Sequence, residues 1–197
     1  DGYHGLSSGT SMLAFLSFGF IAHMHHDAML ACICLAALAS IVGFFLLNYP
    51  WGKIFLGDGG AYFIGFMLAW VAVLLPTRNP EVSPWVSLVI CAYPFIEVIY
   101  SMLRRKLQKK QVGQPDNEHM HSLLARHVVR KNLRHLPHNT QNAAVAPLIW
   151  LPVTLFIIPA VAFRGSTGLL VLTTGVAFVL YHLLHRRLVS LSTARPK

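Results

Sequence analysis

Six long apolar segments, separated by polar connections, run along the chain. A helix that crosses a membrane needs roughly 20 mostly apolar residues. The pattern predicts such helices at Leu6–Ala22, Ala28–Leu47, Ala61–Leu75, Trp85–Leu103, Ala143–Phe163 and Thr167–Leu184. The fold class that we expect is therefore all-α: a polytopic membrane helix bundle with about six transmembrane helices. A composition of 55% hydrophobic and 12% charged residues argues against a soluble domain.

Basic residues are distributed unevenly between the two sides of the predicted membrane. When the connections are placed on alternate sides, 14 of the 16 Lys and Arg residues fall on the side of residues 1–5, and only Arg78 and Arg164 fall on the other. The positive-inside rule makes the first side cytoplasmic. We expect the basic excess to meet anionic lipid headgroups and phosphorylated substrates. Nucleic acid is not an expected partner, because the basic residues lack an interleaved aromatic pattern.

The longest polar connection, residues 104–142, lies on this cytoplasmic side. Within it, Met120, Leu123, Leu124 and Val128 recur near helical spacing, which predicts a short amphipathic helix on the membrane surface. We treat residues 1–197 as a single membrane domain that contains this loop. Because the sequence opens at Asp1, inside a polar turn with glycines, we expect it to be the C-terminal part of a longer protein.

The stretch from Lys53 to Gly60 carries the strongest candidate chemistry. Asp58 lies among Gly57, Gly59 and Gly60, at the mouth of the third apolar segment. Glycines let a backbone approach a ligand closely, and a helix start offers unpaired N–H groups to an anion. A carboxylate there suits Mg²⁺, which binds one or two carboxylates together with substrate phosphates. The alternative is that Asp58 only caps the next helix. Lys53 either pairs with a phosphate or extends to the interface.

Further candidates follow on the same side. Glu97 lies about 10 Å below Arg104 at 1.5 Å per residue, so it faces the bundle or a wet cavity, or else reaches up to Arg104 or Arg105. Pro94 is expected to bend its helix. His119 and His121 would point the same way only in an extended segment or a turn, where they could hold a diphosphate or a metal. The alternative is a solvated pair.

Two other groups of residues receive structural interpretations. The run from His23 to Asp27 has the composition of a metal site, but the predicted topology places it on the opposite side, as an interfacial loop. Cys32, Cys34 and Cys91 fall inside predicted helices and are interpreted as small packing residues.

The order of the motifs resembles a known family. The chain contains a D-G-x-x-G-L turn from Asp1, K-I-F-x-G-D-G-G from Lys53, P-x-x-E from Pro94 running into Arg104-Arg105, and P-D-x-x-H-x-H ending at His121. This series resembles the polyprenyl-phosphate N-acetylhexosamine-1-phosphate transferases (glycosyltransferase family 4), and most closely the undecaprenyl-phosphate GlcNAc-1-phosphate branch. The muramoyl-pentapeptide branch, which usually has three consecutive histidines, is the alternative within the family.

The resemblance implies a reaction and its participants. A sugar-1-phosphate, N-acetylhexosamine-1-phosphate by this likeness, would pass from a UDP-sugar to undecaprenyl phosphate with release of UMP. This is the first membrane step of cell-envelope polysaccharide synthesis, as for O-antigen. It implies Mg²⁺, with Mn²⁺ as the alternative, and an enzyme in the bacterial inner membrane with a cytoplasmic active site. The partners would be undecaprenyl phosphate, UDP-N-acetylhexosamine and membrane lipids, and a homodimer is left open.

The resemblance also assigns roles to residues. Asp58 and Asp1 match acids that would be catalytic and bind metal, and His119 and His121 match the motif that contacts the sugar nucleotide. We add as substrate-binding candidates Lys53, Gly57, Gly59, Glu97, Arg104 and Arg105. Two departures stand out: His4 occupies an Asp/Asn position, and the family's adjacent aspartate pair, which lies upstream, is absent from the sequence. The activity of this chain by itself is therefore doubtful, and an inactive truncated protein and a lipid transporter remain as alternatives.

Overall fold

The structure, a computed structural model, describes residues 2–107 and 118–193. Each regular element in these ranges is a helix, which confirms the all-α fold class. In chain order the helices are α1 (Leu6–Met24), α2 (Ala28–Asn48), α3 (Gly57–Arg78), α4 (Trp85–Ile90), α5 (Ala92–Leu107), α6 (Met120–Leu124), a π-helical turn (Ala125–Val129), α7 (Arg130–Asn132), α8 (His138–Ala143), α9 (Val145–Ala162) and α10 (Thr167–Thr193).

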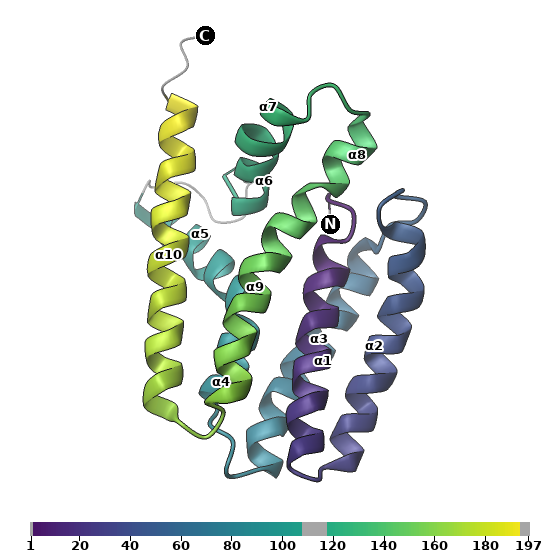
Figure 1. Cartoon of the computed structure of the whole chain (residues 1–197), viewed down its shortest axis with the longest axis vertical. Coiled ribbons are helices and arrows are strands. Elements are labelled where there is room, and N and C mark those ends of the chain that lie inside the picture. Colours follow the sequence, from purple (N-terminus) through teal and green to yellow (C-terminus); the bar gives the residue numbers. More distant parts are fainter. Residues whose placement is uncertain (1, 108–117, 194–197) are drawn as a thin grey trace.

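The long helices run side by side along the length of the molecule (Figure 1). Within the described residues, five helical segments are long and apolar enough to cross a membrane: α1, α2, α3, α8 with α9, and α10. Many large apolar side chains on them face outward, including Leu35 on α2 and Leu172 on α10, which are more than 60% exposed. In water such a surface would be unusually apolar, whereas in a bilayer it faces lipid.

The predicted fourth membrane helix, Trp85–Leu103, is not one continuous helix. It is divided at Cys91 into α4 and α5, neither of which is long enough to span a bilayer by itself. Pro94 provides the reason, because it has no N–H for the carbonyl of Ile90 and its ring crowds that carbonyl. The bend expected at Pro94 is therefore a full break. It sends α5 away from the bundle axis (Figure 1).

The third helix begins earlier than the pattern predicted. The apolar run starts at Ala61, but α3 starts at Gly57, so Asp58, Gly59 and Gly60 form its first turn. Hydropathy marks where a helix enters lipid, and a helix can extend beyond that point into the polar interface. The same effect carries α10 from the expected end at Leu184 to Thr193.

Helix α1 forms the centre of the packing. Phe15, Phe18 and Ile21 are almost completely buried in the main core cluster, which also takes residues from α2, α3, α4, α9 and α10. Near the start of α1, Gly9 lies directly against the indole of Trp150 on α9; a Cβ built on Gly9 would lie 2.2 Å from Nε1. This close approach brings α9 against the N-terminal turn.

The connections gather at the two ends of the bundle. The turn before α1, the connection from α2 to α3 and the segment from α6 to α8 all lie at the end shown uppermost in Figure 1. The turns α1–α2, α3–α4 and α9–α10 lie at the other end. The segment from α6 to α7 is helical, as predicted, but it buries Met120, Leu123 and Val129 against the bundle instead of lying free on a membrane surface.

Candidate functional site

The N-terminal turn is held by side chains from two other helices. Asn142 accepts a hydrogen bond from the His4 backbone N–H at 2.7 Å, and Asn48 accepts one from Gly5 at 2.7 Å. Each asparagine also donates, Asn142 to the carbonyl of Gly2 and Asn48 to that of Ile54. Asn48 thereby ties the turn to the stretch that leads into α3. Asp1, at the beginning of the turn, lies outside the described residues.

His4 fills the space between this turn and the α2–α3 connection. Its ring is buried and packs beside Gly52 and the ring of Phe55, whose centroid is 6.0 Å away. Burial, and then the nearby His138, lower the pKa of His4 below its usual value. His4 is therefore a neutral packing residue near pH 7. It does not supply the carboxylate that the family resemblance would place there.

Asp58 lies in the first turn of α3 and is exposed. The capping position belongs to Leu56, two residues earlier, so the alternative interpretation of Asp58 as an N-cap is wrong. Gly57 has φ +66°, which a residue with a side chain adopts only with strain. Within the described part of the chain, and apart from the adjoining residues and the backbone of α3, no heavy atom lies within 4 Å of a Cβ built on Gly57 or Gly59. The start of α3 therefore presents a carboxylate and backbone N–H groups in open space.

The buried Glu97 pairs with the half-buried His119. Glu97 is 8% exposed, and its Oε1 accepts hydrogen bonds from His119 Nδ1 at 2.8 Å and from the backbone N–H of Met120 at 3.1 Å. The break before α5 turns Glu97 inward, and the extended backbone of His119 (φ −63°, ψ 148°) brings its ring to the carboxylate. Glu97 thus bonds to His119, whereas Arg104 pairs with Glu118.

His119 and His121 point the same way. Their rings are nearly parallel, with centroids 5.4 Å apart and an interplanar angle of 10°. Nδ1 of His121 is 3.2 Å from the hydroxyl of Tyr93, and Tyr3 approaches the same ring edge-on at 5.3 Å. The extended conformation at His119 produces this arrangement. It is the backbone conformation that we expected to be necessary if the two histidines were to point the same way.

The basic candidates occupy different environments at the same end of the molecule. Lys53 is exposed, with its Nζ 5.4 Å from the centroid of the Trp51 ring. Arg104 lies beside Glu118, and Arg105 is buried. His185 on α10 is also buried at this end, and it donates from Nε2 to the carbonyl of Glu118 at 2.9 Å.

One cavity connects these elements. It has a volume of about 310 Å³, and its walls come from the start of α1, the start of α3, and α4 with α5. Leu56 and Ala61 line it on either side of the Asp58 turn, and Glu97 and His121 line it from across the bundle. Asp58 itself does not line the cavity. The structure therefore brings His121, Glu97 and the neighbours of Asp58 to a common space, and His119 adjoins it through its hydrogen bond to Glu97.

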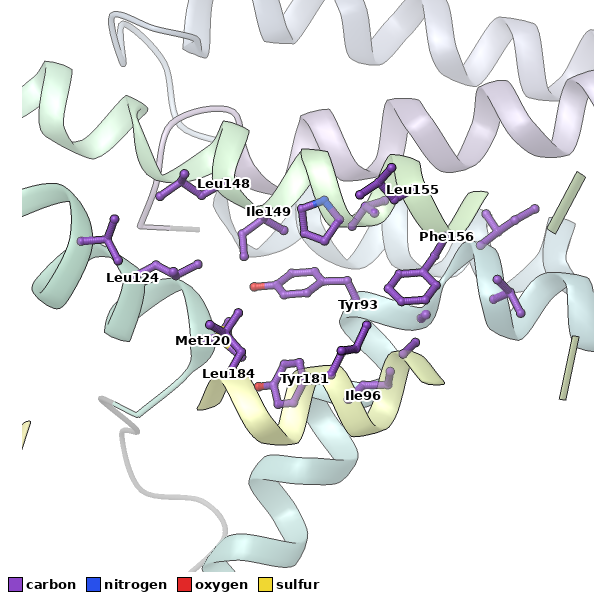
Figure 2. A pocket seen from close by; sticks show the side chains of 18 residues that line it. Tyr93, Ile96, Met120, Leu124, Leu148, Ile149, Leu155, Phe156, Tyr181 and Leu184 are labelled. Carbon is purple, nitrogen blue, oxygen red and sulfur yellow. The ribbon is translucent and has the colours of Figure 1, made fainter. Parts of the chain in front are cut away.

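A second cavity of about 430 Å³ lies behind the first and is almost entirely apolar. Tyr93 lines both cavities. Figure 2 shows that the Tyr93 and Tyr181 rings direct their hydroxyls to the side where Met120 lies. Sequence reasoning missed Tyr93, although it lies four residues before Glu97, on the same helical face. Nothing in the sequence distinguished Asn48 or Asn142 from ordinary polar residues at helix ends.

The described residues offer few side chains that could bind the Mg²⁺ expected from the sequence. Over residues 2–107 and 118–193, no three His, Cys, Asp or Glu side chains come together as a metal site. Asp58 is nevertheless an exposed oxygen donor at a helix start, and this fits Mg²⁺, which needs few protein ligands when substrate phosphates supply the others.

The run from His23 to Asp27 has a structural role at the opposite end. Asp27 caps α2 through the N–H of Leu30 at 3.1 Å, and its carboxylate bonds to Nε and Nη2 of Arg78 at 2.6 and 2.9 Å. The bond to Arg78 is the main cause of an Asp27 pKa lowered to about 2. Arg164 donates to His25 Nε2 at 3.0 Å. These contacts tie the connections at this end together.

The comparisons with known proteins agree with the resemblance seen in the motifs. Residues 1–76 match the model of glycosyl transferase family 4. The chain is 33% identical over 133 residues to "Undecaprenyl-phosphate alpha-N-acetylglucosaminyl 1-phosphate transferase" of Escherichia coli (strain K12), covering 64% of this chain and 36% of the relative. It is 32% identical over 131 residues to the Yersinia pestis protein of the same name, with the same coverage.

A more distant relative comes from Bacillus subtilis (strain 168), "Probable undecaprenyl-phosphate N-acetylglucosaminyl 1-phosphate transferase". It is 27% identical over 125 residues, covering 63% of this chain and 35% of the relative. The matched part of the chain thus spans little more than a third of the length of these relatives. No solved structure shows significant similarity to the chain.

Proposed function

We propose that the protein represented by this chain transfers N-acetylhexosamine-1-phosphate from a UDP-sugar to undecaprenyl phosphate and releases UMP. The observation that carries the proposal is the cavity lined by residues at the start of α3, by Glu97 and by His121, whose ring stacks on that of His119. The cavity lies in a membrane helix bundle, and the relatives of this chain are named for such a transfer reaction. The muramoyl-pentapeptide branch is less well supported, because the chain has His-x-His where that branch usually has three histidines.

The donor and the acceptor are both anionic, so the site must overcome their repulsion. We assign Asp58 as one metal ligand and Asp1, by resemblance only, as a second. When bound, Mg²⁺ (or Mn²⁺) would supply positive charge that offsets the repulsion between the phosphates and stabilises the charge that develops as the bond to UMP breaks. The backbone N–H groups at the start of α3 also favour a phosphate beside Asp58.

The chain's basic and aromatic residues would hold the two substrates. We assign His119 and His121 to the diphosphate of the UDP-sugar, because His121 lines the cavity and the His119 ring lies parallel to it. Lys53, which is exposed at the same end, would attract phosphorylated ligands, and Arg104 and Arg105 add positive potential. The polyprenyl chain would lie along apolar helix surfaces while its phosphate stays at the interface.

This arrangement implies a multi-pass protein of the bacterial inner membrane with its site on the cytoplasmic face. A transporter would instead place polar groups near the bilayer midplane, between repeats. Here the elements that carry candidate residues, namely the turn before α1, the connection from α2 to α3 and α6, lie toward one end of the bundle (Figure 1). The enzyme is therefore the better-supported class.

The test is release of UMP from UDP-N-acetylglucosamine with undecaprenyl phosphate, measured on the native protein in its own membranes. We expect Asp58→Asn to abolish transfer without a change in melting temperature, because the side chain is exposed. Glu81→Gln, at the opposite end of the molecule, is the matched control and should retain the wild-type rate. Near-normal turnover by Asp58→Asn would exclude the metal role, and absence of UMP from the wild type would exclude the reaction.

A further inference from the structure

Glu97 is a buried carboxylate with a specific set of contacts. Its Oε1 receives the N–H of His119 and the backbone N–H of Met120, the first residue of α6. It therefore fixes the orientation of the His119 ring and the start of the helix that carries His121. Because a carboxylate only accepts hydrogen bonds, the His119 ring must carry its proton on Nδ1.

Tyr93 makes the corresponding contact to the second histidine. It lies one turn before Glu97 on α5, and its hydroxyl is 3.2 Å from Nδ1 of His121. Both imidazoles are thus contacted at Nδ1 by side chains of the same helix, and their rings are parallel. In an imidazole, Nε2 lies on the opposite edge from Nδ1, so the two Nε2 atoms have a shared orientation.

The burial of Glu97 is unfavourable for stability. Its carboxylate is removed from water and is approached by the hydroxyls of Tyr93 and Tyr181 as well as by His119. Burying a carboxylate is unfavourable even where it is hydrogen-bonded, because the charge loses its hydration. An apolar residue of similar size at such a position is often neutral or stabilising. Stability therefore does not explain the carboxylate, whereas the orientation of His119 does.

We propose that Glu97 and Tyr93 are positioning residues that hold the pair His119 and His121 by their Nδ1 atoms and direct the Nε2 edges toward the diphosphate of the sugar nucleotide. The identity of the ligand rests on the proposed function, whereas the positioning geometry rests only on the contacts of Glu97 with His119 and of Tyr93 with His121. A residue that bonds the far nitrogen of a ligand-binding imidazole fixes both its tautomer and its direction.

The first experiment reads the histidine directly and needs no activity. The purified protein, labelled with ¹⁵N-histidine, gives an imidazole signal for His119 that is assigned by its loss in His119→Gln. We expect a protonated, hydrogen-bonded Nδ1 in the wild type and a changed Nδ1 signal in Glu97→Gln. Glu81→Gln makes the same chemical change on a side chain that is 85% exposed near the other end, and it should leave the signal unchanged. An unchanged His119 signal in a folded Glu97→Gln protein would overturn the proposal.

The second experiment measures the dissociation constant for UDP on the same proteins. We expect it to rise about tenfold in Glu97→Gln, the lower end of the effect of losing a residue that orients a ligating histidine. Tyr93→Phe should weaken binding through His121, whereas Tyr62→Phe, which alters a side chain 76% exposed on α3, should not.

The outcomes separate the two proposals. If the wild type binds no UDP while the His119 signal still depends on Glu97, the proposed function fails and the contact stands. If UDP binds equally well to the wild type, Glu97→Gln and Tyr93→Phe, the positioning role is wrong even where the signal changes. A Glu97→Gln protein that fails to fold is replaced by Tyr93→Phe, which removes only one oxygen.

Discussion

Individual residues in this chain have roles that their types alone do not indicate. Asp58 and Asp27 are both acids near the start of a long apolar helix, yet only Asp27 is a cap, and its carboxylate is occupied by Leu30 and Arg78. Asp58 is exposed, two residues after the capping position. The difference comes from Gly57, whose left-handed backbone starts α3 before the acid. An unoccupied, exposed carboxylate is the one suited to a ligand.

His4 gives a prediction about pH at the same scale. Burial lowers its pKa in the folded protein, so below a pH of about 6.5 the unfolded state binds more protons than the folded state. This contribution to stability is present above that pH and is lost as the pH falls toward the folded pKa. We expect the melting temperature in detergent to fall between pH 7 and 5, and to fall less steeply in His4→Asn.

The slope with pH, and not the absolute melting temperature, is the diagnostic quantity, because His4→Asn also removes packing against Gly52 and Phe55. His135→Asn is the matched control: this side chain is exposed at the same end of the molecule and should leave the wild-type slope unchanged. Equal slopes for the wild type and His4→Asn would mean that burial of His4 does not contribute to the acid sensitivity.

At the scale of helices, the sequence predicted which segments are helical better than it predicted where a helix breaks or ends. The apolar runs at Ala28–Leu47 and Ala143–Phe163 correspond closely to α2 and to α8 with α9, because lipid-facing residues must be apolar all round. The run Trp85–Leu103 looked continuous because hydropathy does not register a missing N–H. Pro94 was the residue that indicated a disturbance of this helix, and the structure shows a break between α4 and α5 where we expected a bend.

The candidate site was predictable as a set of residues but not as a set of contacts. The motifs named Glu97 and His119 separately, and only the fold joins them across 22 residues. Tyr93 was missed because its contribution depends on where α5 lies relative to His121. Pairing between distant segments is decided by packing, which local patterns do not encode. The assignments of Asp58 and Asp1 to a metal remain predictions.

The contact between α1 and α9 provides a prediction at the scale of helices. A methyl group on Gly9 would overlap the Trp150 indole, and such overpacking typically costs about 1–3 kcal/mol. A mid-helix glycine with open space around it should instead gain up to about 1 kcal/mol on conversion to alanine. We therefore expect Gly9→Ala to lower the melting temperature and Gly43→Ala, which has no neighbour within 4 Å, to maintain or raise it.

Thermal unfolding of the two variants in the same detergent makes this comparison. The contact also matters for the site, because Trp150 donates to the carbonyl of Gly5 and so helps to hold the N-terminal turn. Equal melting temperatures for Gly9→Ala and Gly43→Ala would show that the two helices can separate without loss of stability, and that the turn is held by Asn48 and Asn142 alone.

For the whole molecule, charge and chemistry are concentrated at the same end. At the other end Arg78 and Arg164 are balanced in number by Asp27 and Glu81, so in the topology predicted from the sequence the formal charge of +9 falls on the side of residues 1–5. The Arg78 and Asp27 side chains are also paired directly. This distribution argues for an inward-facing site more strongly than a count of Lys and Arg alone, because the few cations on the opposite side are neutralised.

The orientation can be measured with single cysteines in a background from which Cys32, Cys34 and Cys91 have been removed. Lys53→Cys and Glu81→Cys place exposed thiols near opposite ends of the bundle. In inside-out vesicles a membrane-impermeant maleimide should label Lys53→Cys, and in right-side-out vesicles it should label Glu81→Cys. The reverse pattern would place the cavity, Asp58 and the histidine pair outside the cell, where nucleotide sugars are scarce, and the proposed reaction would then have no donor. Labelling of both positions in one vesicle type would mean that α3, the helix between them, does not cross the bilayer.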